Sequence, residues 1–484
     1  MSVILTLIVS NTVTASSEFD EWKKKQEASF TTYLNEEQAA FRQALETDWE
    51  NFKLAQPNVL YSEPKFDEPP VAPKEPKKIV DVVPEPNISP EPSPIPMPEP
   101  VPEVEPEPIP APEPTPDPIQ TKPVNRNQIE ILYLGRSYQL PKLSFEFHKL
   151  KADNTEIAEA WESLYPELPE IAETIGGDPA FESLSDWALI SLLNKYAKKA
   201  AKSDENGGQL ILWALLMELG YDARLAYDKQ HLYVLLPSKQ KIYGKSSLNF
   251  HGINYYLLTG RAPESSLYTH TKTLDTNGIF DFAFSDEQPV KGLIPRKHKL
   301  KDEKSGISVS YLTYPQLGEY YRYHPLLDFV WYFRVSPSDP HYLKLVDELK
   351  VSLNGLSDMA KVRALLSLIQ YGFEYKRDHE QWGEEYYSTP MHTLMLDAVD
   401  CEDRSFLFAY LVEQVVGIDT VGLKYPGHLA VAVAVDSGDM AINSDYVVVE
   451  GRKFYVADPT YIGADVGQAM TTFNGVTPQI INKH

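Results

Sequence analysis

Aromatic side chains recur at a fixed interval near the N-terminus of the chain. Four phenylalanines are spaced eleven residues apart: Phe19, Phe30, Phe41 and Phe52. An eleven-residue repeat corresponds to about 3.67 residues per turn, so these side chains share one face of a straight or slightly right-handed helix. The pattern predicts one long amphipathic helix over residues 16–55. Its aromatic face could pack on the chain's own domain, but the regular spacing favours self-association through residues 17–54.

Further along the chain, two stretches share one hydrophobic plan, a helix followed by a strand. In the first, an apolar helical run is closed by Gly220, and eleven residues later His231 opens an apolar strand. In the second, a similar run is closed by Gly417, and eleven residues later His428 opens an apolar strand. The pattern predicts an α+β fold in which a helix packed on an antiparallel sheet is duplicated. Chance is the competing explanation, because helix–glycine–strand units are common.

The two copies differ at positions that would carry chemistry. Asn206 stands in the first copy where the second has Cys401. The predicted return strand ends near Ser246 in the first copy and at Asp458 in the second. Neither residue of the first copy can replace the thiol or the carboxylate. We therefore predict that residues 126–265 are a catalytically inactive copy, kept for scaffolding or binding.

The first copy also indicates how the hairpin of the second is built. Its strand turns directly and runs back through residues 241–243. By analogy, residues 436–444 of the second copy are an insertion in the hairpin, after which the chain resumes its direction and turns at residues 450–452. This arrangement places Asp458 next to His428, whereas a simple meander would leave the carboxylate at the far end of the sheet.

Composition sets the remaining boundaries. More than half of the 39 prolines fall between Pro57 and Pro123. Such sequence favours extended polyproline II, at about 3.1 Å per residue, so residues 56–125 are expected to be a disordered spacer. A recognition segment for a proline-binding domain is the alternative. Strand-like sequence predicts a small β region at residues 266–345, which leaves residues 346–484 as the catalytic domain.

The first residues resemble a secretory signal. A short apolar run, Val3–Val9, precedes the small residues Val13-Thr14-Ala15, although no basic residue precedes the run. Residues 1–15 are therefore expected to be removed, and the product to be periplasmic or secreted. No later stretch approaches the roughly 20 apolar residues of a membrane span. The formal net charge of −24 argues against binding to nucleic acid.

Cys401 is the one cysteine of the chain. An exported chain with one cysteine cannot form internal disulfides, so the residue is either a buried small hydrophobe or a thiol kept for chemistry. The acidic neighbours Asp400 and Glu402 favour the second interpretation. The first turn of a helix favours a thiolate, whereas the flanking carboxylates oppose it. A positive group should offset them: a protonated His428, Arg404 or a bound cation.

Cys401, His428 and Asp458 supply the residue types of a thiol nucleophile, its base and an orienting carboxylate. Alone, His428 would more commonly be a histidine at the edge of the core, and Asp458 would more commonly cap a turn. Together they predict cysteine-based acyl transfer, in which Cys401 attacks an amide, His428 moves the proton and Asp458 orients His428.

Three motifs resemble the transglutaminase-like superfamily, whose fold is papain-like. They are Asp-Cys-Glu-Asp-Arg at residues 400–404, Tyr-Pro-Gly-His at residues 425–428 and Ala-Asp-Pro-Thr-Tyr at residues 457–461. The resemblance covers about a quarter of the chain, and it implies that the cysteine, histidine and aspartate of these motifs match the nucleophile, the base and the orienting group of the family.

The acidic motif is also similar to that of bacterial transglutaminase-like cysteine proteinases, in which carboxylates beside the cysteine bind calcium. This resemblance implies a calcium site at Asp400 and Glu402, with no other cofactor required. Glu402 stands where eukaryotic transglutaminases usually have Trp, so hydrolysis of a protein or peptide amide is favoured over crosslinking. Two alternatives remain: an amine-accepting transglutaminase, and a catalytically inactive envelope protein whose two copies are binding modules.

Overall fold

The computed structural model describes residues 23–25, 36–59, 66–73, 127–202, 204–260, 263, 266–270, 276–284, 292–335, 340–436, 438, 440–441 and 443–483. The predicted signal segment, residues 16–22 and 26–35 of the predicted N-terminal helix, and most of the predicted spacer lie outside these residues. The described residues up to Ala72 and from Asn127 onward form one compact unit. Within that unit we distinguish an N-terminal lobe (residues 36–57 and 127–284) and a C-terminal lobe (residues 292–483).

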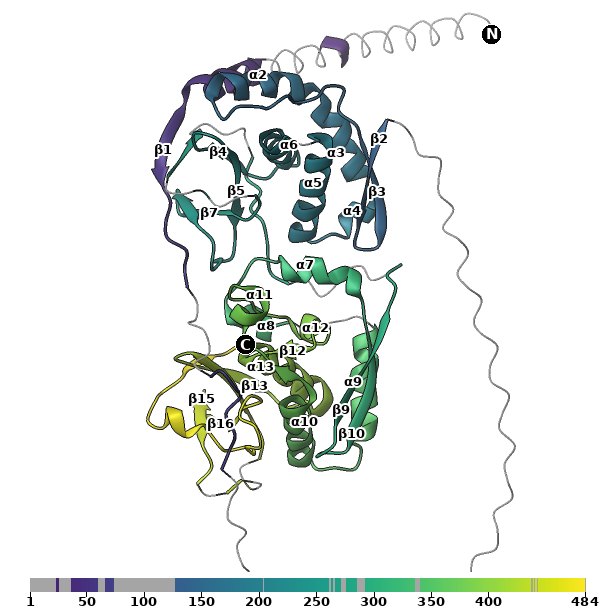
Figure 1. Ribbon diagram of the computed structural model, residues 1–484, viewed down its shortest axis with the longest axis vertical. Helices are drawn as coiled ribbons and strands as arrows, with labels where there is room; N and C mark the ends of the chain where they lie inside the picture. Colours follow the sequence, from purple (N-terminus) through teal and green to yellow (C-terminus); the bar gives the residue numbers. More distant parts are fainter. Residues whose placement is uncertain are drawn as a thin grey trace, which may run out of the picture. The chain divides into compact units, whose positions relative to one another are not determined.

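The N-terminal lobe is built on a six-stranded sheet with the order β1-β8-β4-β5-β7-β6, in which every pair is antiparallel (Figure 1). Its strands are β1 (Trp49–Lys53), β4 (Arg224–Tyr227), β5 (Leu232–Ser238), β6 (Ser247–Phe250), β7 (Ile253–Leu257) and β8 (Ser266–His270). The helices beside it are α2 (Asn154–Leu164), α3 (Leu168–Gly177), α4 (Pro179–Glu182), α5 (Asp186–Ala200) and α6 (Glu205–Glu218). A separate hairpin is formed by β2 (Gln128–Tyr133) and β3 (Arg136–Pro141).

Helix α6 is the centre of this lobe. It packs against both α5 and β5, and its residues from Leu210 to Leu216 are fully buried (Figure 1). The helix begins where the Asp204 side chain accepts a hydrogen bond from the Gly207 backbone N–H, which satisfies a first-turn donor. It ends before Gly220, whose φ of 88° suits a residue without a side chain. The apolar run predicted from the sequence is therefore a central core helix.

The C-terminal lobe carries a five-stranded sheet with the order β15-β16-β14-β13-β17. Its strands are β13 (Thr420–Tyr425), β14 (His428–Val433), β15 (Tyr446–Val449), β16 (Arg452–Ala457) and β17 (Gln479–Ile481). The helices are α7 (Gly318–Arg322), α8 (Phe329–Phe333), α9 (Pro340–Ser352), α10 (Asp358–Gly372), α11 (Asp378–Trp382), α12 (Pro390–Thr393) and α13 (Cys401–Leu411). Two further strand pairs are the hairpin β9 (Arg296–Asp302) with β10 (Ile307–Thr313), and the parallel pair β11 (Glu374–Tyr375) with β12 (Ala398–Val399).

Helix α13 packs against β14, as α6 packs against β5 in the other lobe. It continues through a π-helical turn, Val412–Val416, and stops at Gly417 with φ 79°. The α+β class and the antiparallel sheets predicted from the sequence are thus confirmed. The strand predicted at residues 428–433 is β14, with the same bounds.

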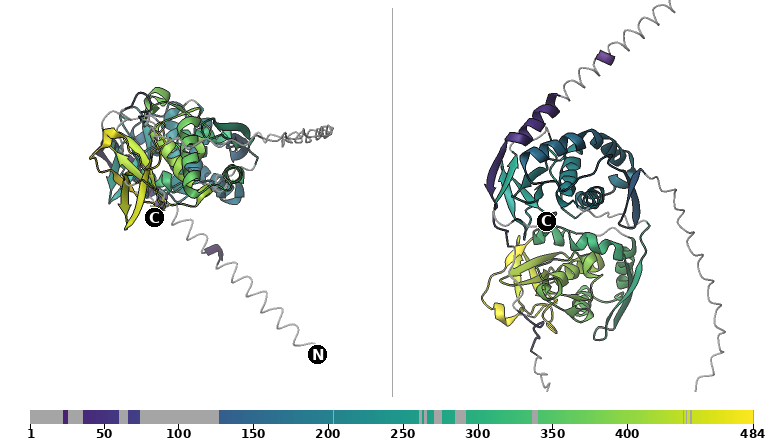
Figure 2. Two further views of the ribbon diagram at one scale, coloured as in Figure 1. Left: turned by 90° about the horizontal axis from the view of Figure 1, so that it is seen from below. Right: turned by 45° about the horizontal axis from the view of Figure 1, so that its top comes forward.

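The predicted helix over residues 16–55 is too long at its C-terminal end. Residues 36–47 are helical, but Trp49–Lys53 form β1, which pairs with β8 (Figure 2). Phe41 is fully buried, with its ring 5.3 Å from Trp161 and 6.0 Å from Trp213 between centroids. In the described part, the aromatic face therefore packs on the chain's own domain, which was the alternative to self-association.

Three boundaries also need correction. Residues 66–72, predicted as spacer, contact the C-terminal lobe through backbone hydrogen bonds with Ile462. Residues 266–345, predicted as a small β region, contain β8 of the first sheet, the β9–β10 hairpin and the helices α7 and α8. Residues 241–243, predicted as the return strand of the first copy, make one isolated bridge, and β5 pairs instead with β7. No helix among the described residues is long and apolar enough to cross a membrane.

Candidate active site

Cys401 is the first residue of α13, and the strand before it fixes its position. The short strand β12 pairs in parallel with β11, so Tyr375 lies opposite Val399, two residues before the cysteine. Asp400 has an extended backbone (φ −107°, ψ −155°) and turns the chain into the helix without capping it by a side-chain hydrogen bond. Cys401 is fully buried, and its thiol donates a hydrogen bond to Glu402 Oε2, 2.7 Å away. The thiol thus lies where unpaired helix N–H groups converge.

His428 follows a tight turn, and Asp458 follows the strand next to it. Tyr425 and His428 are paired across the two-residue turn Pro426-Gly427, in which Gly427 has φ 69°. Strand β14 pairs with β16 so that Val431 lies opposite Ala457. That register brings the carboxylate of Asp458 to His428, with Nε2 and Oδ2 2.8 Å apart. The predicted insertion between the strands is confirmed, because β15 forms the edge of the sheet and β16 returns beside β14.

The His428–Asp458 pair is buried and charged. Both side chains are at most 3 % exposed. Burial alone would lower the pKa of His428, but the Asp458 carboxylate and the Cys401 thiol outweigh it and raise that pKa to about 10. The other ring nitrogen, Nδ1, makes no hydrogen bond of ordinary geometry, although the thiol is close enough to affect the imidazole. At neutral pH the histidine is therefore an imidazolium beside the sulfur of Cys401.

Gln370, on α10, holds the loop that carries Asp458. Its Nε2 donates to the carbonyl oxygens of Asp458, Tyr461 and Ala464 at 3.2, 2.9 and 3.1 Å, and its Oε1 accepts from the Gly463 N–H at 3.1 Å. The side chain is 3 % exposed. Sequence reasoning missed this residue, since a glutamine in an apolar helix carries no motif; a polar residue on the buried face of an amphipathic helix was the available signal.

A cluster of carboxylates surrounds the start of α13. Asp378, Asp400 and Asp403 have oxygen atoms within 4.8 Å of one another, and so do Asp378, Glu385 and Glu402. Asp378 accepts from the Tyr386 backbone N–H and Asp403 from that of Ser388, each at 2.8 Å. Both oxygens of Asp400 and Oε1 of Glu402 have no hydrogen-bond partner among the described residues. Asp378 and Glu385, in a different helix and loop, were not predicted from the sequence.

This cluster fits a bound cation. Burial, followed by repulsion from neighbouring acids, raises the pKa values of Asp400 and Glu402 well above their usual range. Buried carboxylates without donors are costly unless they are protonated or coordinate a metal. Calcium takes six to eight oxygen ligands from carboxylates and carbonyls, which is the donor chemistry present here.

Arg404, predicted as one possible source of positive charge, points elsewhere. Its guanidinium donates to the carbonyl oxygens of Gln370 and Phe373, at 3.3 and 3.0 Å, and lies over the ring of Tyr375. Burial lowers its pKa to about 10, so it stays charged at neutral pH. These hydrogen bonds fix the end of α10, and the guanidinium acts on the acidic cluster through its charge, which favours the ionised forms of Asp400 and Asp403.

The corresponding place in the N-terminal lobe holds different groups. Asn206 donates to the carbonyl oxygens of Leu150 and Gln230, and accepts from the Leu232 N–H, so its amide serves the fold. Continuing the pairing of Leu235 with Leu257 by two residues places Thr259 opposite Tyr233, and Thr259, rather than the predicted Ser246, then stands where the other lobe has Asp458. The predicted inactive copy thus lacks both the thiol and the carboxylate.

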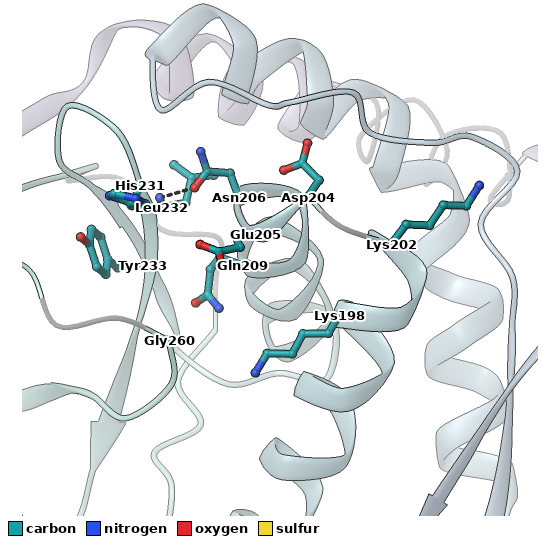
Figure 3. A pocket seen from close by; sticks show the side chains of 10 residues that line it. All are labelled: Lys198, Lys202, Asp204, Glu205, Asn206, Gln209, His231, Leu232, Tyr233 and Gly260. Atoms are coloured by element: carbon teal, nitrogen blue, oxygen red, sulfur yellow. Dashed lines mark hydrogen bonds between the residues drawn. The ribbon is translucent and has the colours of Figure 1, made fainter.

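A cavity of about 550 Å³ lies at this place in the N-terminal lobe (Figure 3). His231 and Asn206 lie at one side of it, and Lys198 reaches toward it from α5. The Oε1 atom of Gln209, a largely buried side chain, has no hydrogen-bond partner there. The N-terminal lobe therefore has an open pocket at the place that corresponds to the Cys401 site of the other lobe.

Comparison with known proteins adds little to this geometry. No family model matches the chain, and no curated protein matches it. One solved structure, described as a "Putative Cysteine Protease" from Cytophaga hutchinsonii, is 11 % identical and covers 53 % of this chain and 80 % of its own. Its TM-score is 0.20, a value at which the likeness carries no argument. The functional conclusion rests on the site itself.

Proposed function

We propose that this protein is a cysteine hydrolase of the transglutaminase-like type that cleaves an amide bond in a protein or peptide. The observation that carries the proposal is the meeting of three elements: α13 begins with Cys401, and β14 and β16 bring His428 and Asp458 to within 2.8 Å of each other beside it. Nucleophile, base and orienting carboxylate are what thiol acyl transfer needs.

In the proposed reaction, the Cys401 sulfur attacks the carbonyl carbon of the amide while the imidazolium of His428 balances the thiolate. The backbone N–H of the first turn of α13 stabilises the oxyanion. His428 gives its proton to the leaving amine, which departs and leaves a thioester on Cys401. Water then attacks the thioester, His428 takes the proton of that water, and the free carboxylic acid leaves with the thiol restored.

We also propose that calcium binds the acidic cluster, with Asp378, Asp400 and Glu402 as central ligands and Glu385 and Asp403 beside them. The bound ion would supply positive charge next to the nucleophile, where the flanking carboxylates otherwise oppose a thiolate. Export to the periplasm or the outside and a first lobe that is an inactive copy remain proposals from the sequence.

The test uses a generic unfolded protein, such as fluorescein-labelled casein, together with a dansylated primary amine. Hydrolysis should release new carboxyl ends detectable by mass spectrometry, without incorporation of the amine. Amine incorporation would instead identify an amine-accepting transglutaminase. Cys401→Ala should abolish turnover while far-UV circular dichroism stays unchanged. Full turnover in that variant would exclude the proposed mechanism and favour the alternative of a binding protein.

A further inference from the structure

A short segment from the N-terminal part of the chain lies against the candidate active site. Residues 66–72, here called the strap, contact the C-terminal lobe at both ends. At one end the ring of Phe66 meets the imidazole of His428 edge-on, with centroids 5.9 Å apart and an interplanar angle of 79°. At the other end the Ala72 N–H donates to the Ile462 carbonyl, and the Ile462 N–H donates to the Pro70 carbonyl, each at 2.8 Å.

The aromatic end of the strap lies beside the reacting groups. The imidazole of His428 stacks on Phe473 at 5.5 Å, and Phe66 is 6.4 Å from the same Phe473 ring. The carbonyl oxygen of Phe66 accepts a hydrogen bond from the Tyr375 hydroxyl at 3.3 Å. Tyr375 is the residue that β11 places opposite Val399, next to the start of α13. A backbone carbonyl of the strap is therefore hydrogen-bonded to a side chain of β11, the strand that pairs with β12 just before Cys401.

The rest of the strap is held as an extended peptide would be. The two hydrogen bonds with Ile462 form an isolated parallel β-bridge between Val71 and Ile462. Ile462 lies four residues after Asp458 in the chain. Asp67 forms an ion pair with Arg377 at 2.8 Å. Main-chain pairing with an extended chain, together with pockets for selected side chains, is a common mode of peptide recognition. The side chain of Val71 is 71 % exposed, so at that position it is the backbone that is recognised.

We propose that the strap occupies the substrate groove of the Cys401 site, and that this groove takes an extended peptide with an aromatic side chain against His428 and an acidic side chain next to it, facing Arg377. This inference deepens the proposed function and rests on it. While the strap is in place, it blocks access to the thiol, which agrees with the complete burial of both Cys401 and His428.

The first test is the alkylation of Cys401 by iodoacetamide in the full-length protein at one fixed pH. The chain has one cysteine, so the label reports one site. Phe66→Ala should raise the second-order labelling rate about 10-fold or more, because the thiol is exposed whenever the strap is away. A control is Tyr268→Ala, which truncates an aromatic ring of the N-terminal lobe that is 39 % exposed. Its rate should stay within about twofold of the wild type.

A second variant acts through the backbone. Ala72→Pro removes the N–H that donates to Ile462 and should also raise the labelling rate. Melting temperatures of all variants identify any increase that arises from unfolding. Wild-type rates in both Phe66→Ala and Ala72→Pro, with unchanged melting temperatures, would overturn the strap proposal.

The substrate class is tested by adding the groove's occupant in trans. A synthetic peptide with the sequence of residues 64–74 should slow the labelling of Phe66→Ala back toward the wild-type rate, and the same peptide with alanine for Phe66 should do so at least about 10-fold less well. Equal protection by both peptides, or by neither, would exclude the aromatic preference. If the peptide protects Cys401 of Phe66→Ala from labelling but this variant does not cleave casein, the proposed hydrolase is contradicted and the peptide groove is supported. If the variant cleaves casein but the peptide does not protect Cys401, the hydrolase is supported and the groove is contradicted.

Discussion

At the scale of single residues, the account depends most on the charge of His428. Its pKa is raised to about 10 because the Asp458 carboxylate outweighs the effect of burial. Asp458→Asn removes that charge and should lower the pKa of His428 well below 10, since burial is then opposed by Cys401 alone. The ring resonances of His428, assigned by comparison with His428→Gln, measure the shift by NMR titration. A pKa that stays near 10 in Asp458→Asn would show that another group holds the proton.

The same pair predicts how stability changes with pH. Because the folded-state pKa of His428 lies above its unfolded value, its contribution to stability is complete below about pH 6.5 and is lost as the pH rises toward about 10. Urea unfolding of the wild type should therefore lose this contribution over that interval. In Asp458→Asn the loss should be smaller, with other titrating groups common to both proteins.

The acidic cluster makes a second prediction at the residue scale. If calcium binds the folded state as proposed, at about 100 times its dissociation constant it should stabilise the wild type by about 2.7 kcal/mol relative to protein in EDTA. Asp400→Asn removes a ligand charge and should shrink the calcium-dependent rise in melting temperature. Glu303→Gln, at a side chain 84 % exposed, is the control and should keep the full rise. No response to calcium in the wild type would mean that protons neutralise the cluster.

At the scale of elements, the site depends on the loop between β16 and the C-terminus, and Gln370 holds that loop. Gln370→Leu leaves three buried carbonyl groups without their donor and should reduce the free energy of unfolding by about 2–4 kcal/mol. Gln139→Leu, at an exposed position of β3, should change it by less than about 0.5 kcal/mol. Urea denaturation measures both. An equal effect of the two substitutions would show that the loop is held by other contacts.

Helices and strands whose apolar residues recur at a regular spacing could be predicted from the sequence. The run before Gly417 and the strand from His428 are where the pattern placed them, and the analogy between the two copies correctly placed Asp458 beside His428, although the return strand of the first copy is β7 and not residues 241–243. Periodicity failed where tertiary packing decides. Trp49–Lys53 continue an aromatic repeat with helical spacing, but they become a strand because the edge of the sheet at β8 is available to them.

Contacts between distant segments could not be predicted. Nothing in the residues around Phe66 indicates that it lies against His428, more than 350 positions later. The same holds for Asp378 and Glu385, whose carboxylates join those of α13 through the packing of separate helices and loops. Single-sequence patterns report local periodicity, and a site assembled from remote loops leaves no such record.

At the scale of the whole molecule, we expect turnover to depend on the C-terminal lobe alone. Asn206→Ala breaks the hydrogen bonds that tie α6 to neighbouring loops and should reduce the free energy of unfolding by about 1–3 kcal/mol. Turnover per folded molecule should not change, because the N-terminal lobe has neither a thiol nor a carboxylate at the matching positions. Casein turnover, normalised to the folded fraction from circular dichroism, checks this. A selective loss of turnover in folded Asn206→Ala would show that the first lobe takes part in catalysis.

The central claim is that Cys401 and His428 act as a pair. The most direct test is the pH dependence of iodoacetamide labelling of Cys401 in Phe66→Ala, where the strap cannot hide the thiol, with and without His428→Ala. The account predicts rapid labelling with an apparent pKa well below the unperturbed thiol value of about 8.5, and a rise in that pKa when the imidazolium is removed. Labelling with an ordinary pKa that does not respond to His428→Ala would contradict the proposed enzyme and favour a binding protein.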